Sequence, residues 1–446
     1  MNIIHAKFHF IGIGGIGMCG LAELLHGMGA KVTGSDLSEN ANVKRLKDLG
    51  ISICMGHKAE SVDQADVVVF SSAVPQDNPE LVEAKKRKIP IIRRAEALAE
   101  ILRLKRSVCI AGTHGKTTTT SLMASMMIDA DLDPTIIVGG KLQSLGTTAK
   151  LGQGAWGVAE ADESDGSFSK LSPVIAVITN IDRDHMDFYK SQQVLEKAFR
   201  DFAEKIPFYG RLVICGDDDR TFELFQDFPK PMSTYGFHSR NEYRLEKEGH
   251  KYKIFHGDQF VEEFCLSMPG RHNALNALAG FIVGREIGLE DQVAVRGLEG
   301  FSGVGRRFEL KAVIDGVDYF DDYAHHPTEL KAVLSAFKER FPDRRIVALF
   351  QPHRFSRTQD LWKDFMTSFQ DADQVYISDI YPAGESPLPG ISSEQLATEI
   401  GDKKVRYFGE LSQPNLMGLK AELKAGDVLV TLGAGSISKL AEVLHK

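Results

Sequence analysis

The chain has 446 residues, of which 43% are hydrophobic and 26% charged, the composition of an ordinary globular protein with several cores. Its 53 basic and 61 acidic side chains give a formal net charge of −8, which argues against a nucleic-acid binder that depends on neutralising phosphates. Five cysteines without C-x-x-C spacing indicate neither a disulfide framework nor a zinc cluster, and no apolar run approaches the ~18 residues of a membrane span. At ~100–200 residues per domain we expect two to four domains, with three as the working number, in a cytoplasmic protein.

The first predicted unit is a strand, a glycine turn and a helix at the N-terminus. Residues 7–11 have a strand pattern, residues 12–17 read G-x-G-x-x-G, and a helical stretch follows over 18–28. About 20 residues past the glycines, Asp36 ends the next strand and can accept ribose hydroxyls. A nicotinamide cofactor is the first hypothesis, although any nucleotide diphosphate needs the same close approach to backbone. The alternation is expected to continue to residue 105, with strands over 31–36, 66–70 and 89–92.

A phosphate-binding loop, A-G-T-H-G-K-T over 111–117, opens the second region. A short β-branched strand over 107–110 precedes it, and a helical pattern follows. In this context backbone N–H groups and the helix N-terminus cradle phosphate oxygens, while Lys116 supplies a positive charge and Thr117 a Mg²⁺ ligand. The general pattern G-x-x-x-x-G-K-[ST] requires glycine where this chain has Ile110, so the loop is a shorter G-T-x-G-K-T form.

Two further strand ends in this region carry candidate site residues. The strand over 156–160 ends on Glu160, and more carboxylates follow up to Asp165. Beside a phosphate loop such a cluster is where Mg²⁺ is held, and an acidic surface turn is the alternative. The strand over 174–178 leads to His185. Local sequence leaves that histidine equally compatible with a metal ligand, a substrate contact and a turn residue.

Asparagines and glycines mark the end of the second region. Asn273 and Asn276 share one face of an alanine-rich helix. Asn273 is compatible with a helix cap, whereas Asn276 is better explained by a polar contact to a ligand. Gly303 and Gly305, followed by two arginines, indicate a hinge that bears a phosphate contact, although solvated arginines beside a loop are the commoner case.

The last region alternates again and predicts a second open α/β sheet. Strands are expected over 317–320, 345–350, 374–379 and 428–432, with helices over 327–340 and near 361–369. Two strand ends carry polar segments, D-D-Y-A-H-H-P from residue 321 and Q-P-H-R-F-S-R-T from residue 351. Their histidines and arginines suit an anionic group such as a carboxylate, which Arg354 and Arg357 can clamp in a bidentate way.

Taken in order, these motifs resemble those of the Mur ligase family of peptidoglycan synthesis. The resemblance spans essentially the whole chain through GIGGIGM, AGTHGKTTT, AEADESDGSF, TNIDRDHMD, MPGRHNALNA, GVGRRFE, DDYAHHPTE, QPHRFSRT and TLGAGSI. The shortened phosphate loop is that of the family. Within it, AEADESDGSF and QPHRFSRT are similar to the alanine-adding pattern, not to that of the recycling members that attach a ready-made tripeptide.

The resemblance implies an α/β fold of three domains. These are an N-terminal Rossmann-like domain for the UDP-sugar over 1–105, a central P-loop ATPase-type domain over 106–304, and a C-terminal Rossmann-like domain with the amino-acid site over 305–446. The implied reaction joins L-alanine to the lactyl carboxylate of UDP-N-acetylmuramate through an acyl phosphate, with ATP and Mg²⁺. By this interpretation the N-terminal glycines hold the UDP diphosphate and not NAD. A monomer or homodimer without nucleic-acid partner or membrane insertion is expected.

The resemblance also assigns roles to individual residues. The residues expected at the UDP-sugar are Gly14, Gly15, Ile16, Gly17, Asp36 and Ser71. The residues expected at ATP are Gly112, Thr113, His114, Gly115, Lys116, Thr117, Thr118, Asn273, Asn276, Arg307 and Asp322. The metal is expected at Thr117, Glu160 and His185, the catalytic groups are expected to be Lys116, His185 and Arg307, and the amino acid is expected at Tyr323, His325, Arg354 and Arg357.

Two other classes of function are weighed against the ligase. A nicotinamide-dependent oxidoreductase would account for the first glycine turn and Asp36, but it would leave the phosphate loop and the Glu160 cluster without a role. A non-catalytic ATP-binding regulator would not require Lys116, Glu160 and His185 together. The sequence therefore favours an ATP-dependent ligase.

Overall fold

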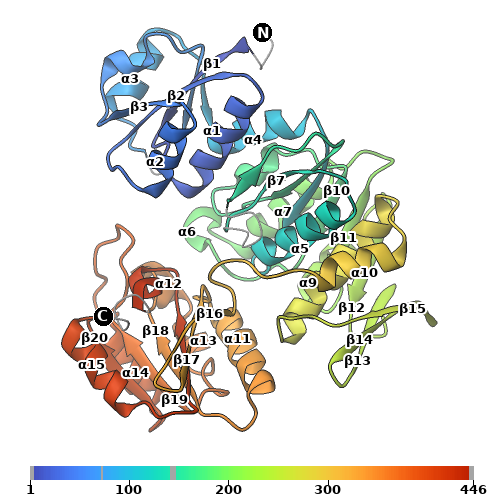
Figure 1. The fold of residues 1–446 in the computed structure, drawn as a ribbon, viewed down its shortest axis with the longest axis vertical. Helices are drawn as coiled ribbons and strands as arrows, with labels where there is room; N and C mark the ends of the chain where they lie inside the picture. The colour runs from blue at the N-terminus through green and yellow to red at the C-terminus, as the bar shows by residue number, and fades with distance from the viewer. Residues whose placement is uncertain (1–4, 72–73, 141–146, 441–446) are drawn as a thin grey trace. The chain divides into compact units, whose positions relative to one another are not determined.

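The computed structural model describes residues 5–71, 74–140 and 147–440 (Figure 1). The chain divides into two compact units. The first unit comprises Met1–Arg183, Phe188–Cys265 and Asn276–Ser302, and the second comprises Asp184–Asp187, Leu266–Leu275 and Gly303–Lys446. Three sheets, mostly parallel, confirm the predicted α/β class. Two of these sheets belong to the first unit and one to the second.

The first sheet has five parallel strands in the order β3-β2-β1-β4-β5. Its strands are β1 (Lys7–Ile11), β2 (Lys31–Asp36), β3 (Ser52–Met55), β4 (Val67–Phe70) and β5 (Ile91–Arg93). Its helices are α1 (Ile16–Gly27), α2 (Ala41–Asp48), α3 (Pro79–Lys86) and α4 (Arg94–Leu102). The chain order reverses at β1, and ligands of open α/β sheets bind at such a switch point beyond the strand carboxyl ends.

The second sheet has ten strands in the order β15-β14-β13-β12-β11-β10-β6-β9-β7-β8. Its parallel strands are β6 (Arg106–Ala111), β7 (Thr135–Ile137), β9 (Trp156–Glu160), β10 (Ile175–Ile178), β11 (Arg211–Cys215), β12 (Met232–Gly236) and β13 (Tyr243–Glu248). Antiparallel pairing adds β8 (Ala149–Lys150), β14 (Lys251–His256) and β15 (Gln259–Phe264). The helices of this region are α5 (Lys116–Asp129), α6 (Met186–Tyr189), α7 (Gln192–Ala203), α8 (Asp219–Phe225), α9 (Arg271–Glu286) and α10 (Asp291–Glu299).

The third sheet, in the second unit, has six strands in the order β16-β17-β21-β18-β19-β20. Its strands are β16 (Glu309–Ile314), β17 (Val317–Asp322), β18 (Ile346–Phe350), β19 (Gln374–Ser378), β20 (Val405–Gly409) and β21 (Val428–Leu432). Its helices are α11 (Pro327–Arg340), α12 (Phe355–Asp360), α13 (Trp362–Phe365), α14 (Ser393–Ile400) and α15 (Gln413–Glu422). The helix expected near 361–369 is present but shorter than expected, because α13 ends at Phe365, and Leu361 with φ −107° separates it from α12.

Local sequence explains where several helices begin. The side chain of Asn78 accepts the N–H of Glu80 ahead of Pro79 in α3, and proline is well tolerated in a first helical turn. At α11, His326 accepts the N–H of Thr328, and Glu329 completes a capping box. Apolar strands fill the cores, as in β18, which is buried over its whole length. In the described part of the chain no helix is long and apolar enough to cross a membrane.

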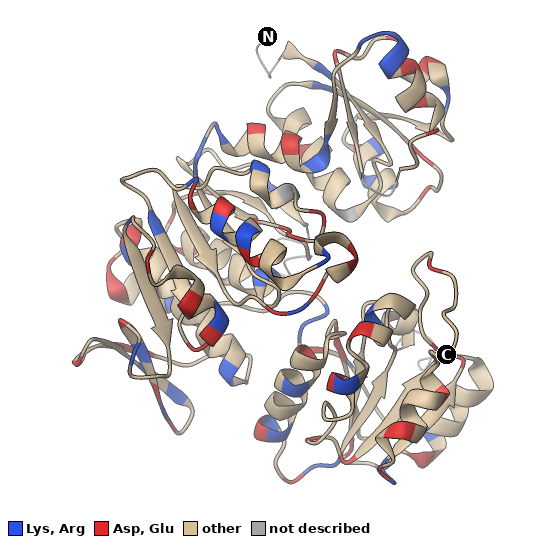
Figure 2. Ribbon diagram, turned by 180° about the vertical axis from the view of Figure 1, so that it is seen from behind, with Lys and Arg blue, Asp and Glu red and all other residues tan. Residues whose placement is uncertain are grey.

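Charged side chains are distributed over the helices of all three sheets. Figure 2 shows lysines and arginines interspersed with aspartates and glutamates along the drawn elements. The formal net charge of −8 is thus the small excess of acidic over basic residues that are mixed along the chain.

Candidate active site

The glycine turn after β1 is held by the end of β2. Gly12 has φ +74°, and its N–H donates to Ser35 O at 2.9 Å. The N–H of Gly14 donates to Asp36 Oδ2 at 2.8 Å. Helix α1 then begins without a side-chain hydrogen bond at its N-cap, Gly15. The N–H groups at a helix N-terminus without a side-chain cap can bind an anion such as a diphosphate.

Most residues expected at the UDP-sugar lie at this carboxyl edge of the first sheet. The strand register pairs Ile11 with both Ser35 and Phe70, so the segments that follow β1, β2 and β4 start side by side. These segments contain Gly14, Gly15, Gly17, Asp36 and Ser71. The side chain of Ile16 and the two residues after Ser71 lie outside the described part. In this structure the Asp36 carboxylate shapes the turn.

The phosphate loop between β6 and α5 depends on two glycines with positive φ. Gly112 has φ +130° and Gly115 has φ +83°. A Cβ on Gly112 would lie 2.0 Å from Thr179 Oγ1, and a Cβ on Gly115 would lie 2.8 Å from Asn276 Oδ1. The N–H of Thr113 donates to the carbonyl of Asn180 at 3.0 Å, which ties the loop to the segment after β10. Conformation and space thus both require glycine in this loop, and Asn276 lies against it.

Lys116, the first residue of α5, is enclosed by acceptors. Its Nζ donates to the carbonyl of Gly112 at 2.6 Å and to Glu163 at 2.8 Å. The side chain of Lys116 is 12% exposed and that of Glu163 only 1%. Burial raises the pKa of Glu163 to about 7, even though Lys116 acts in the opposite direction. Glu163 was not among the expected site residues, and its position in the A-D-E-S-D run was the available signal.

Thr117 and Glu160 form an oxygen-rich pair beside the loop. The Thr117 hydroxyl donates to Glu160 Oε2 at 2.9 Å, and the N–H of Gly139 reaches the same oxygen at 2.8 Å. The next threonine, Thr118, is buried in α5. Burial alone would raise the pKa of Asp162, but the charges of Lys116 and Arg94 outweigh it, so the pKa is lowered. Hydroxyl and carboxylate oxygens are the donors that fit Mg²⁺.

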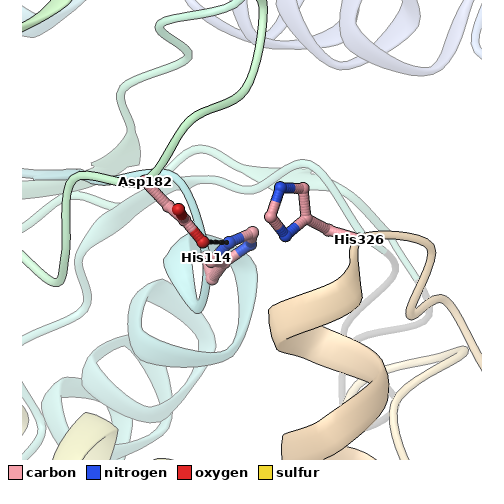
Figure 3. Close-up of side chains that lie close together, drawn as sticks. All are labelled: His114, Asp182 and His326. Carbon is pink, nitrogen blue, oxygen red and sulfur yellow. Dashed lines mark hydrogen bonds and ion pairs between the residues drawn. The ribbon is translucent and has the colours of Figure 1, made fainter. Parts of the chain in front are cut away.

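His114 also belongs to the phosphate loop. Its Nε2 lies 3.0 Å from Asp182 Oδ2, and Figure 3 shows the imidazole ring turned toward that carboxylate. The backbone N–H of Asp182 donates to the hydroxyl oxygen of Thr113 at 2.9 Å. Asp182 therefore fixes both Thr113 and His114, two of the residues expected at ATP.

His185 and its neighbour Asp184 belong to the second unit. His185 has φ +57°, and its Nε2 lies 3.6 Å from Asp184 Oδ2. Arg357 forks onto Asp184, with Nε at 3.2 Å from Oδ1 and Nη2 at 3.3 Å from Oδ2. Burial would raise the pKa of Asp184, but Arg357 and the imidazoles of His185 and His325 hold it well below its usual range. Asp184 is a second residue of the candidate site that was not among the expected ones.

The other residues expected at the amino acid lie in the segments that follow β17 and β18 in the second unit. Arg354 has φ +73° and donates from Nε to Glu385 Oε1 at 2.6 Å and from Nη2 to Asp187 Oδ2 at 3.2 Å. The rings of Tyr323 and His325 meet edge to face with centroids 5.2 Å apart. Burial lowers the pKa of His325 to about 3, so this imidazole is neutral at physiological pH. The two arginines are thus each oriented by carboxylates of the protein.

Asp322 and Asn273 are occupied by backbone groups. Asp322 is 2% exposed and accepts the N–H groups of Phe308 and Ala324 at 2.8 and 2.9 Å. Burial raises its pKa to about 6, against the charge of Arg307. Asn273 donates to the carbonyl of Pro269 at 2.7 Å from inside α9. The helix-cap interpretation of Asn273 is therefore wrong, because α9 begins two residues earlier.

Arg307 lies beside the same aromatic ring as its neighbour. The guanidinium carbons of Arg306 and Arg307 lie 4.9 and 5.2 Å from the centroid of the Tyr323 ring. Nη1 of Arg307 is also 3.8 Å from Glu329 Oε1. Arg306 pairs with buried Asp321 at 3.0 Å. Tyr323, expected at the amino acid, therefore lies beside both arginines.

Family models match this chain over nearly its whole length. They are the Mur ligase family catalytic domain over residues 7–106, the Mur ligase middle domain over 110–284, and the Mur ligase glutamate ligase domain over 306–435. The UDP-N-acetylmuramate–L-alanine ligase of Bdellovibrio bacteriovorus is 52% identical across 100% of both chains. That of Geobacter sp. strain M21 is 47% identical over 98% of this chain and 96% of its own.

Solved structures agree with these matches. The UDP-N-acetylmuramate–alanine ligase of Thermotoga maritima superimposes with a TM-score of 0.82 at 30% identity, covering 98% of each chain. A murein peptide ligase of Psychrobacter arcticus reaches a TM-score of 0.74 at 23% identity over 99% of this chain and 98% of its own, a likeness of fold alone. The three matched domains and these full-length relatives show that the chain belongs to the Mur ligase family.

Proposed function

We propose that this chain is an ATP-dependent ligase that joins L-alanine to the lactyl carboxylate of UDP-N-acetylmuramate, an early step of peptidoglycan precursor synthesis. The observation that carries the proposal is the phosphate loop, where Lys116 Nζ donates to Glu163 at 2.8 Å and the Thr117 hydroxyl donates to Glu160 at 2.9 Å. The relative that is 52% identical over the full length carries this activity in its name. A nicotinamide oxidoreductase would use none of these four side chains.

The chemistry requires activation of a carboxylate, which is a poor electrophile. A carboxylate oxygen attacks the γ-phosphorus of ATP, and ADP leaves. The neutral amine of alanine then attacks the carbonyl carbon of the acyl phosphate, loses a proton, and phosphate departs as the amide forms. Lys116 neutralises charge on the migrating phosphoryl group, and positioning with electrostatic stabilisation supplies most of the catalysis.

The metal fits the donor set beside the loop. The Thr117 hydroxyl and the Glu160 carboxylate would hold Mg²⁺, since they are hard oxygen donors 2.9 Å apart at a phosphate site. When bound, Mg²⁺ would neutralise charge on the β- and γ-phosphates. His185 is the candidate for a further metal or for the acyl phosphate. The neighbouring Asp184 orients that imidazole.

The remaining substrate contacts follow from the chemistry of each edge. Gly14, Gly15, Gly17, Asp36 and Ser71 would hold the UDP moiety at the first sheet. Asn273, Asn276, Arg307 and Asp322 would contact ATP. Alanine would bind at Tyr323, His325, Arg354 and Arg357. Its carboxylate can accept hydrogen bonds from guanidinium N–H groups that do not contact the protein's own carboxylates.

The domain limits of 1–105, 106–304 and 305–446 belong to the same proposal. They are supported by the end of α4 at Leu102, the start of β6 at Arg106, and the division of units between Ser302 and Gly303. A cytoplasmic location and a monomeric or homodimeric state remain predictions.

Phosphate release is the assay that tests the function. Purified chain, ATP, Mg²⁺ and UDP-N-acetylmuramate are mixed with either L-alanine or the tripeptide L-alanyl-γ-D-glutamyl-meso-diaminopimelate. We expect alanine-dependent release and little with the tripeptide. Preference for the tripeptide would assign the chain to the recycling activity. Calorimetric titration with NAD should give no saturable binding, and micromolar affinity there would reopen the oxidoreductase hypothesis.

A further inference from the structure

Arg94 lies at a junction that the motifs did not identify. It is the first residue of α4, and its Nη2 is 3.3 Å from Asp162 Oδ2. A Cβ on Gly17 would lie 2.7 Å from Nη1 of Arg94 and 3.0 Å from its Cδ. The guanidinium therefore lies against the last glycine of the first turn while it contacts an acid of the phosphate-loop cluster. In a dinucleotide fingerprint that glycine serves helix packing. Here it makes room for an arginine.

Other contacts fix this junction within the first unit. A Cβ on Gly20, on α1, would lie 2.9 Å from Cβ of Ala149, on β8. The first helix after the glycine turn thus packs directly on an edge strand of the second sheet. Arg94 and Asp162 bridge the same two sheets. One guanidinium consequently stands between the proposed diphosphate site and the proposed site of phosphoryl transfer.

The charges at the junction explain why a cation is needed there. Glu160, Asp162 and Glu163 place three carboxyl groups beside the phosphate loop. A substrate carboxylate that must reach the γ-phosphate approaches this acidic cluster and is repelled by it. Lys116 already has Glu163 as a close partner. Arg94 places a second cation against this cluster, with Nη2 3.3 Å from Asp162 Oδ2.

The geometry leaves Arg94 able to bind a second anion. Its side chain is 31% exposed and that of Asp162 is 39% exposed, so their contact is not sealed from solvent. Nη2 contacts Asp162, and Nη1 lies beside Gly17, the last glycine of the turn proposed to hold the diphosphate. A guanidinium with five N–H groups can serve two carboxylates at once.

We propose that Arg94 binds the lactyl carboxylate of the sugar nucleotide and guides it from the glycine turn toward the phosphate loop. The proposal rests on the function proposed above and adds a specificity-determining residue to it. Arg94 would distinguish a UDP-sugar that carries a carboxylate from one that does not. Asp162 would act as a positioning residue that holds the guanidinium when the sugar nucleotide is absent.

Two ligands separate a carboxylate contact from a diphosphate contact. UDP-N-acetylmuramate carries the lactyl carboxylate, and UDP-N-acetylglucosamine has the same diphosphate without it. Calorimetry would measure the Kd of both for the full chain, for Arg94→Ala and for Arg94→Lys. The matched control is Arg93→Ala, which removes an exposed arginine one residue away. Melting temperatures of all variants would be measured alongside.

The expected result is selective. Arg94→Ala should bind UDP-N-acetylmuramate about 10- to 100-fold more weakly, the loss typical of a charge-assisted hydrogen bond, and UDP-N-acetylglucosamine within about twofold of the unmodified chain. Arg94→Lys should retain part of the affinity, since it keeps the charge but not the fork. Arg93→Ala should change neither Kd.

Three results would overturn the proposal. Equal weakening for both ligands would move Arg94 to the diphosphate, and unchanged binding of both would make it a purely structural ion pair. If Arg94→Ala does not fold, Arg94→Lys decides, and unaltered discrimination between the ligands by that variant would also refute the contact. The proposed function fails separately, when the unmodified chain itself does not bind UDP-N-acetylmuramate.

Discussion

Two glycine turns in this chain have the same backbone plan and different chemistry around them. Each follows a buried parallel strand and opens a helix, α1 in one case and α5 in the other. The first turn, residues 12–17, contains only glycine and isoleucine. The N–H of Gly14 in this turn donates to the carboxylate of Asp36. The second turn ends in Lys116 and Thr117, which meet Glu163 and Glu160.

The difference shows how side chains convert a phosphate cradle into a site for phosphoryl transfer. The first turn offers backbone N–H groups and a helix N-terminus, which suffice to bind an anion. Under the proposed function, the second adds a cation for the charge that would develop in transfer and oxygens that would hold a metal. Changes at the first turn should therefore alter substrate affinity, whereas changes at the second should alter turnover.

The strongest test of this contrast is Lys116→Ala. Loss of the lysine should lower kcat for alanine-dependent phosphate release by about 10²–10³ or more, because a contact made in the transition state is lost. The KM for UDP-N-acetylmuramate should change little. Circular dichroism would verify the fold, and Lys170→Ala, which removes an exposed lysine of the same region, is the control. Near-normal turnover by folded Lys116→Ala would refute the assignment of the second turn.

A stability comparison of the two turns should give the next largest effect. Gly112→Ala places a Cβ 2.0 Å from Thr179 Oγ1 at φ +130°, so urea unfolding should show a loss of about 3 kcal/mol or a failure to fold. Gly15 has φ −63°, and the nearest atom to a Cβ there would be 3.5 Å away. Gly15→Ala should change stability by less than about 1 kcal/mol.

The affinity of Gly15→Ala for UDP-N-acetylmuramate completes the comparison of the two turns. Gly15→Ala should fold but bind UDP-N-acetylmuramate more weakly, because the added methyl group keeps the diphosphate from the backbone. If Gly15→Ala proves as unstable as Gly112→Ala, the turns share one structural constraint and the contrast loses its basis. If Gly15→Ala binds the sugar nucleotide normally, the diphosphate does not lie on this glycine.

Sequence patterns predicted the parallel strands and glycine turns well because these features are local. Strands β1, β2 and β21 and helix α11 have the expected bounds, since apolar runs and caps mark them directly. The antiparallel additions β14 and β15 were missed, although Gly249 and Gly257 mark their turns. Alternating charged residues on a solvated ribbon give a weak hydrophobic signal.

The site was predictable by motif and less so by residue. A run such as A-D-E-S-D predicts a carboxylate cluster, but only the fold shows that Glu163 forms an ion pair with Lys116. Asp184 lies 173 residues from Arg357, and no local pattern relates the two. The same holds for Arg94, whose partner Asp162 is 68 residues away. Long-range pairing of charges depends on tertiary structure, which spacing along the chain does not encode.

The pH dependence of stability tests the second turn through Glu163, the acid that pairs with Lys116. Burial gives Glu163 a pKa of about 7 in the folded chain, above its ordinary value of 4.5. Between these values the folded state keeps a proton that the unfolded state has released, so the free energy of unfolding falls as pH rises through this window. Relative to Glu163→Gln, the unmodified chain should lose about 1–3 kcal/mol between pH 4.5 and 8.

Urea unfolding at several pH values would measure this difference. Glu100→Gln, which alters an exposed glutamate on α4, is the control and should run parallel to the unmodified chain. Parallel curves for Glu163→Gln as well would show that Glu163 is ionised throughout and that its pairing with Lys116 outweighs its burial.

The smallest effect is expected at the acid of the first turn. Asp36 accepts the N–H of Gly14 through Oδ2 and the N–H of Ser38 through Oδ1. Asp36→Asn retains one acceptor and directs an NH₂ group at the other N–H, so one backbone hydrogen bond of about 1 kcal/mol is lost. The turn should then be less ordered, and the Kd for UDP-N-acetylmuramate should rise roughly threefold to tenfold.

Asp36 orders a turn and takes no part in the chemistry, so kcat at saturating sugar nucleotide should stay within about twofold of that of the unmodified chain. Lys116→Ala should show the reverse, a lower kcat with little change in substrate affinity. Asp66→Asn is the matched control, since Asp66 accepts the N–H of Lys7 at 2.9 Å at the opposite end of β1. It should leave both constants unchanged. A fall in kcat for Asp36→Asn with unaltered affinity would mean that the first turn takes part in transfer, and the division of labour between the two turns would have to be abandoned.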